Sequence, residues 1–281
     1  MQAKTVVVTG GTSGIGEAAA VDLAGRGARI VLIARDRARA EATLNKLRAA
    51  NPSASHAVYF ADLSVIAEMK RVANEIAAAE PRIDVLVNNA GAVFLSRKAS
   101  ADGLEMTFAV NHLAYFVVTN MLLDRLKATP GARIVSTASG AHKAGRIDFR
   151  DLQLETSYRT SRAYGTSKLC NILFTRELAN RLVGSGVTAN CLHPGFVGTR
   201  FGQNNVHNVF MKVIAKVIMA FGLKPENGAK TIIYLASSPD VADVNGKYFY
   251  KCKVAKPSAA AQDDAVAKRL WDVSAELCDV G

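Results

Sequence analysis

Short, almost wholly apolar segments alternate with longer helical ones along the chain, and this alternation limits the possible folds more than any other feature. The β-branched runs expected to be strands cover 4–10, 28–34, 56–63, 83–91, 132–139, 187–195 and 246–251. Helical patterns lie between them, including 15–26, 36–50, 103–127 and 226–236. Strands without a polar face are typical of a parallel sheet covered by helices on both sides. We therefore predict an α/β fold with a doubly wound parallel sheet, which binds ligands at the carboxyl ends of its strands.

The 281 residues show no linker-like change of composition, repeat or low-complexity tract, so we expect one domain over 1–281. No stretch approaches the roughly 18 consecutive apolar residues of a membrane span. The first strand begins at Lys4, so no signal peptide is expected. The four cysteines are scattered without ligand spacing. This favours a reduced, cytoplasmic location, with neither a disulfide framework nor a metal site.

The net charge is +11, but the basic residues are spread along the chain rather than clustered. A nucleic-acid site would need a concentrated patch. We therefore expect a solvated surface with a bias towards anionic ligands, and no nucleic-acid partner.

A glycine-rich loop, TGGTSGIG at 9–16, joins the first expected strand to the first helix. Its glycines Gly10, Gly14 and Gly16 would let the backbone approach a diphosphate at the positive end of the helix. The spacing is G-x-x-x-G-x-G, which differs from the G-x-G-x-x-G dinucleotide fingerprint. A nucleotide site is the favoured interpretation, and a tight turn without a ligand is the alternative.

The second strand ends in Ala34, Arg35 and Asp36. An arginine here accommodates the 2′-phosphate of NADP, whereas an acidic residue favours the ribose of NAD. The sequence thus favours NADP, with NAD possible through Asp36. A solvated start to the next helix is the other interpretation of Arg35.

In order along the chain, the loop at 9–16, ADL (61–63), NNAG (88–91), Asn111, Ser139, YGTSK (164–168) and PGFVGT (194–199) resemble the short-chain dehydrogenase/reductase family. The segments STASGAHKAGRIDFRDL (136–152), AYGTSKLCNILFTRELANRL (163–182) and RLWDVSAEL (269–277) further resemble its retinol dehydrogenase-like branch. The resemblance covers nearly the whole chain. It implies a Rossmann fold and an NADP-preferring oxidoreductase of retinoids or other lipophilic aldehydes and alcohols. It also implies a homodimer or homotetramer, with the long fourth and fifth helices as candidate interfaces.

The resemblance also implies roles for individual residues. For the cofactor, it implies a diphosphate loop of Gly10, Thr12, Ser13, Gly14, Ile15 and Gly16, a 2′-phosphate contact from Arg35, and an adenine pocket with Asp62 and Leu63. It places Asn89, Ala90 and Gly91 on the ribose side, and Pro194, Gly195, Val197 and Thr199 at the nicotinamide amide. The implied catalytic set is Asn111, Ser139, Tyr164 and Lys168, of which the last two also contact the cofactor.

These residue types suit proton transfer to a carbonyl oxygen. A phenol with its usual pKa of about 10 is a poor base, and a neighbouring ammonium group should lower that pKa. Tyr164 is therefore the expected general acid/base, with Lys168 lowering its pKa and holding the ribose. Ser139 would hydrogen-bond the substrate oxygen, since its competitor Ser136 lies deeper in the strand. Asn111 would anchor a water that leads to Lys168, or simply bond a neighbouring backbone group.

Three histidines lie near these residues in sequence: His112, His142 and His193. For His112 and His193 we expect packing or local backbone bonds, because no triad or metal spacing surrounds them. His142 lies near the expected substrate entrance, where a binding role is open.

Two segments are candidates for the substrate side. The connection at 140–162 is long enough to form a flap, and minimal relatives have a shorter one. Residues 196–224 are expected to form a lid, with an apolar stripe at Val209, Phe210, Val213, Ile214, Val217, Ile218 and Phe221. An amphipathic helix on a membrane surface over 206–221 and an ordinary core helix remain alternatives.

We thus expect hydride transfer between NADP and a lipophilic carbonyl or alcohol, such as a retinal-like, aromatic or other apolar aldehyde or ketone. A nucleotide-sensing protein without turnover is the first alternative, disfavoured because Tyr164 and Lys168 are both present. A sugar-nucleotide epimerase is the second, disfavoured by the first glycine loop and by the absence of a larger C-terminal substrate domain.

Overall fold

The computed structural model describes residues 1–195 and 224–280, and its strands form one eight-stranded sheet over these ranges. The order is β3-β2-β1-β4-β5-β6-β7-β8, parallel throughout except for the antiparallel β7–β8 pair. The strands are β1 (Thr5–Thr9), β2 (Arg29–Ala34), β3 (Ala57–Phe60), β4 (Val85–Asn88), β5 (Arg133–Thr137), β6 (Thr188–His193), β7 (Tyr248–Tyr250) and β8 (Lys253–Val254). The predicted doubly wound parallel sheet is confirmed. The chain reverses direction across the sheet between β1 and β4, and such a reversal creates the ligand crevice of this architecture.

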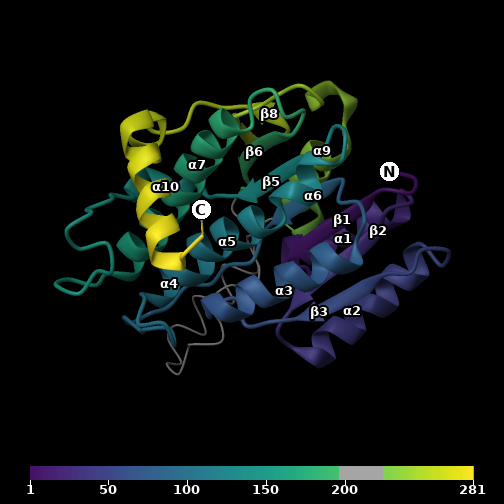
Figure 1. Ribbon diagram of the computed structural model, residues 1–281, viewed down its shortest axis with the longest axis horizontal. Helices are drawn as coiled ribbons and strands as arrows, with labels where there is room; N and C mark the ends of the chain where they lie inside the picture. The colour runs from purple at the N-terminus through teal and green to yellow at the C-terminus, as the bar shows by residue number, and fades with distance from the viewer. Residues whose placement is uncertain (196–223, 281) are drawn as a thin grey trace.

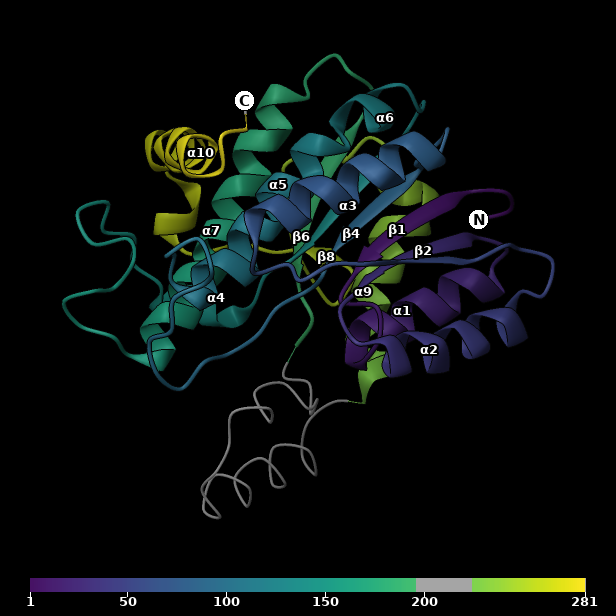
Figure 2. The ribbon, with the colours of Figure 1, turned by 60° about the horizontal axis from the view of Figure 1, so that its bottom comes forward.

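Helices cover both faces of the sheet (Figures 1 and 2). One face carries α1 (Gly14–Gly25), α2 (Arg37–Ala50) and α9 (Pro225–Ser237), and the other carries α3 (Ile66–Ala79), α5 (Ala114–Met121), α7 (Thr160–Arg181) and α10 (Asp264–Cys278). Within β1, Val6 and Val8 pack with the first group, while Val7 packs with the second. All three are fully buried, which explains why the centre of this strand is apolar on both faces.

The single helix expected over 103–127 is in fact four short elements. They are α4 (Met106–Phe108), the π-helical turn η1 (Ala109–Leu113), α5, and α6 (Leu123–Lys127). Helix α4 starts where the Glu105 carboxylate accepts bonds from the Thr107 and Phe108 amides. The wider turn η1 contains Asn111, whose side chain bonds a loop outside the helix. Turns of this kind occur often at functional sites.

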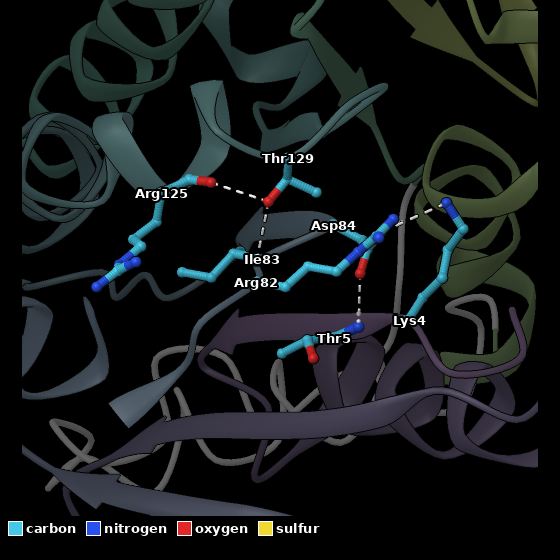
Figure 3. Close-up of polar contacts among 7 residues, drawn as sticks. All are labelled: Lys4, Thr5, Arg82, Ile83, Asp84, Arg125 and Thr129. Atoms are coloured by element: carbon cyan, nitrogen blue, oxygen red, sulfur yellow. Dashed lines mark hydrogen bonds and ion pairs between the residues drawn. The ribbon is translucent and has the colours of Figure 1, made fainter. Parts of the chain in front are cut away.

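The buried residue Asp84 joins β1, β4 and β5 at the edge of the sheet where these strands begin, and Figure 3 shows the bonds of its carboxylate. Asp84 accepts a hydrogen bond from the Thr5 amide at 2.9 Å and ion pairs with Arg82 at 2.6 Å and Lys4 at 3.5 Å. Its own main chain bonds the Thr5 carbonyl and the Arg133 amide, both at 2.9 Å. Asp84 therefore holds three strand starts in register, at the edge opposite the ligand crevice.

Helix α10 packs along α7 (Figure 1). Its Trp271 is buried in the core. The indole stacks on Phe174 of α7 with 5.8 Å between ring centroids and meets Phe116 of α5 edge-on at 4.9 Å. This region of α7, expected as a candidate interface, is thus covered by the same chain. An assembly through α7 would have to include α10.

Three short 3-10 turns complete the described chain: η2 (Gly140–Ala144), η4 (Pro239–Val241) and η5 (Ala259–Gln262). The β7–β8 turn places Lys251 and Cys252 at φ of 50° and 59°. Left-handed backbone at two consecutive non-glycine residues is unfavourable.

Candidate active site

The glycine loop lies at the carboxyl end of β1, packed directly against the turn that follows β4. Gly10 has φ of 65°, and a Cβ there would lie 2.7 Å from the Ala90 Cα. A Cβ on Gly16 would lie 2.3 Å from the Gly10 carbonyl oxygen. Only glycine fits these two positions, since real Cβ atoms do not approach backbone so closely.

Thr9, the last residue of β1 and the first of the TGGTSGIG motif, connects the two loops, although it was not among the predicted site residues. Its hydroxyl oxygen accepts from the Asn89 amide at 2.9 Å and the Ala90 amide at 3.0 Å. The Asn89 side chain in turn donates to the Gly10 carbonyl at 3.1 Å. The predicted diphosphate and ribose segments are therefore held side by side by hydrogen bonds.

The start of α1 suits an anionic ligand. Thr12 and Ser13 precede the helix, and Gly14, Ile15 and Gly16 are its first three residues. Ser13 occupies the N-cap position in an extended conformation, and its side chain makes no capping hydrogen bond. The amide groups of a first helical turn bind phosphate well when no side chain caps them.

The predicted adenosine-side residues also meet. Arg35, at the end of β2, has a side chain 71% exposed and a long 3.8 Å ion pair with Asp62. Asp36 instead caps α2 by accepting from the Arg39 amide at 2.9 Å. Asp62 additionally bonds Ser64, and Leu63 packs against the core. Arg35 is thus available to a phosphate, while the Asp36 carboxylate is engaged in the helix cap.

Asn111 clamps the loop that follows Gly91. Its Oδ1 accepts from the Ala92 amide at 2.7 Å, and its Nδ2 donates to the Ala92 carbonyl and to the Ser167 hydroxyl, both at 3.0 Å. Ser167 donates onward to the Tyr164 carbonyl at 2.8 Å. The side chain therefore bonds the main chain of the loop after Gly91 and, through Ser167, links the ribose-side turn to α7.

Ser139 and Tyr164 come together at the carboxyl end of β5. A hydrogen bond from the Ser139 side chain lowers the pKa of the Tyr164 phenol, but burial acts more strongly and raises that pKa to about 12. The net direction is opposite to the lowered value expected from the sequence. Desolvation of the phenolate outweighs the effect of its neighbours.

Lys168 lies one helical turn beyond Tyr164 and is only 2% exposed. Its Nζ is 5.8 Å from the centre of the Tyr164 ring and donates to the Thr137 carbonyl at 3.1 Å. Burial lowers the pKa of this ammonium group to about 7. The same carbonyl accepts from Asn171 at 3.3 Å. Thr137 therefore holds Lys168 through a main-chain group, for which residue type carries no signal.

His112 and His193 have structural roles. His112 is buried against Ser274, with 2.9 Å between Nε2 and the hydroxyl oxygen, and burial lowers its pKa to about 3. The Nδ1 of His193 accepts from the Gly195 amide at 3.3 Å, and its ring stacks on Tyr250. These bonds confirm the expected packing roles for His112 and His193.

Pro194 and Gly195 follow β6, at the same edge of the sheet as Ser139. Val197, Thr199 and the apolar stripe lie outside the described residues, as does the expected lid at 196–224 except for its last residue. The expected flap is described, and it packs on the loop after β4. Tyr158 donates to the Phe94 carbonyl at 2.7 Å, and Arg97 donates to the Gln153 carbonyl at 3.0 Å.

Across 1–195 and 224–280, no three His, Cys, Asp or Glu side chains are grouped so that they could hold a metal ion. No helix in these ranges has the length and apolar character needed to cross a membrane.

Comparison with known proteins agrees with this arrangement. Residues 4–209 match the short chain dehydrogenase family. Mouse retinol dehydrogenase 14 is 44% identical over 285 residues, covering 98% of this chain and 85% of the relative, and human retinol dehydrogenase 13 is 42% identical over 278 residues, covering 98% and 84%.

Solved structures show the same fold. An uncharacterized protein from Mycobacterium paratuberculosis superposes with a TM-score of 0.79 at 30% identity, covering 99% of this chain and 94% of that one. The NADP complex of Pseudomonas aeruginosa RhlG superposes with a TM-score of 0.70 at 27% identity, covering 88% and 94%. The chain therefore belongs to the short-chain dehydrogenase family, in its retinol dehydrogenase-like branch, and is an NAD(P)-dependent oxidoreductase.

Proposed function

We propose that this protein is an NADP-preferring oxidoreductase of lipophilic aldehydes, ketones or alcohols, with Tyr164 as general acid/base. The observation that carries the proposal is the contact between Ser139 and Tyr164, with Lys168 buried behind them. The pair lies at the same edge of the sheet as the glycine loop, because Ser139 follows β5 and the loop follows β1, two strands that run parallel in the sheet. A reacting carbonyl held there would meet a proton donor and a second hydroxyl.

The residues present fit a dinucleotide. The glycines allow close approach of a diphosphate, the uncapped start of α1 presents amide groups to it, and Arg35 can reach a 2′-phosphate. The engaged carboxylate of Asp36 supports NADP over NAD. When bound, the nicotinamide cofactor supplies or accepts the hydride.

In the reducing direction, Tyr164 provides the proton. With a pKa of about 12, the phenol is protonated at neutral pH and can donate to the oxygen that gains negative charge. The Ser139 hydroxyl oxygen accepts from the Ala141 amide at 3.2 Å, and its hydrogen can turn from Tyr164 to stabilise the same substrate oxygen. In the oxidising direction, Tyr164 must first lose its proton, and a charged Lys168 favours that loss.

The substrate class rests on the relatives and on the flap. Retinol, named in the relatives, is a lipophilic alcohol. The flap bonds the loop after β4 through Tyr158, and this loop carries Phe94 and Leu95, of which Leu95 is 42% exposed. An exposed apolar residue next to the flap supports an apolar substrate.

A substrate panel of retinal, aromatic aldehydes, steroids and quinones, assayed with NADPH and with NADH, tests the proposal. We expect turnover of a lipophilic carbonyl, faster with NADPH. Tyr164→Phe should then lower kcat by about a hundredfold or more, the usual contribution of a positioned general acid. Tyr234→Phe in α9 is the matched control and should keep the wild-type rate. Undiminished turnover in Tyr164→Phe would exclude the proton-transfer role.

A further inference from the structure

His142 connects the Ser139 turn to the C-terminal part of the chain. It lies in η2, the turn that begins directly after Ser139, and its side chain is fully buried. Its Nδ1 is 2.7 Å from the Ser139 carbonyl oxygen, and its Nε2 accepts from the Ser258 amide at 3.1 Å. The ring also packs edge-on against Tyr248, 5.3 Å between centroids. Both nitrogens are thus engaged, and the substrate-binding role left open for this residue is not supported.

The two bonds determine the protonation of the ring. A backbone amide can only donate, so Nε2 must carry a lone pair. A carbonyl oxygen can only accept, so Nδ1 must carry the hydrogen. His142 is therefore neutral and held as the Nδ1–H tautomer. Burial favours the same state, because it lowers the pKa of the ring.

Most hydrogen bonds that Ser139 accepts are donated by residues of η2. The Ser139 carbonyl accepts from the His142 amide at 3.2 Å as well as from the ring, while the Ser139 hydroxyl accepts from the Ala141 amide. The turn packs closely on α7 near Gly165. A Cβ on Gly145 would lie 2.4 Å from the carbonyl oxygen of Gly165, the residue after Tyr164.

We propose that His142 is a positioning residue, which fixes Ser139 relative to Tyr164 by donating from Nδ1 to the Ser139 carbonyl. Its bond to Ser258 anchors the ring to the segment that leads into η5 and α10. The inference rests on the proposed function for its kinetic consequence, but the tautomer follows from the contacts alone.

Three substitutions of His142 distinguish the effect of its bond to Ser139 from that of its bond to Ser258. In His142→Asn the amide nitrogen can take the place of Nδ1, and in His142→Gln the amide can reach only towards Ser258. His142→Ala removes both. We expect His142→Ala and His142→Gln to lower kcat about tenfold, as misplaced catalytic groups do, and His142→Asn to stay within about threefold of wild type. The dissociation constant of NADPH, measured by its fluorescence, should be unchanged in all three.

A double-mutant cycle tests whether the effect passes through Ser139. In a Ser139→Ala background, His142→Ala should cause no further loss of kcat, since no hydroxyl remains to be positioned. Losses that multiply would overturn the proposal. So would a wild-type rate in His142→Ala, or equal losses of kcat and NADPH affinity in all three single variants.

Nitrogen-15 NMR of histidine-labelled protein gives a readout that needs no turnover. The resonance that disappears in His142→Asn should report a protonated Nδ1 and an unprotonated Nε2 at pH 7. An Nε2–H tautomer would overturn the inference even if the enzyme is active. The expected tautomer without any carbonyl turnover would instead contradict the proposed function alone.

Discussion

Removing the buried carboxylate at the amino edge of the sheet should destabilise the fold without touching the active site. The Asp84 side chain is 1% exposed, whereas its partners Arg82 and Lys4 are 52% and 42% exposed. In Asp84→Ala the two cations can turn to solvent, so little of the loss comes from them. The Thr5 amide cannot, because Thr5 is 8% exposed.

We expect Asp84→Ala to lower the free energy of unfolding by about 3 kcal/mol, mainly from the unpaired buried Thr5 amide and the lost charge-assisted bonds. Asp84→Asn keeps one acceptor for Thr5 and should lose only about 1 kcal/mol. Asp148→Ala is the matched control: Asp148 also pairs with an arginine two residues away, Arg150, but at the surface, and its removal should leave stability unchanged.

Urea unfolding, followed by far-UV circular dichroism and by the fluorescence of the single tryptophan, Trp271, measures these differences. The slope of the unfolding free energy against urea concentration should be the same in all variants. A loss below about 1 kcal/mol in Asp84→Ala, or an equal loss in Asp84→Asn, would refute the reasoning about the Thr5 amide.

The same contacts predict the pH dependence. Burial alone would raise the pKa of Asp84, but the hydrogen bonds from Arg82 and Thr5 and the charge of Lys4 hold it below the usual value of 3.8. The unfolded chain therefore binds this proton first as pH falls. The stability difference between wild type and Asp84→Asn should be constant above about pH 5 and shrink below about pH 4. A difference that grew on acidification would contradict the assigned direction.

Three further substitutions test the cofactor site and one strained turn. Arg35→Ala should lower the ratio of kcat/KM with NADPH to kcat/KM with NADH by about tenfold, because it removes one charge-assisted hydrogen bond to the 2′-phosphate. An unchanged ratio would argue against the phosphate contact. Gly16→Ala places a Cβ 2.3 Å from the Gly10 carbonyl oxygen and should weaken NADPH binding about a hundredfold in a fluorescence titration, whereas Gly25→Ala, with no atom within 4 Å, should not. Cys252 has left-handed backbone with φ of 59°, and Cys252→Gly removes the strain of a side chain in this conformation. The free energy of unfolding, measured in urea, should therefore rise by about 1 kcal/mol. A decrease would show that the contacts of the cysteine side chain outweigh the backbone strain.

Features carried by residue type and spacing could be predicted from the sequence alone. The alternation of apolar runs and helices identified the parallel sheet, because strands buried on both faces are made mostly of apolar residues. The glycine loop could be found because only glycine fits where a Cβ would collide with backbone, as at Gly10 and Gly16. Tyr164 and Lys168 could be paired because one helical turn separates them.

The tertiary structure decided what depends on main-chain groups from distant segments. The Thr137 carbonyl that holds Lys168, the Thr9 hydroxyl that joins two loops, and the His142 bond to Ser258 link segments 31, 80 and 116 residues apart. Any residue can present a carbonyl or an amide, so such partners leave no mark in composition or spacing. Burial reversed the expected pKa shift of Tyr164 for a related reason: the desolvation of a side chain depends on everything packed around it, which only the folded chain specifies.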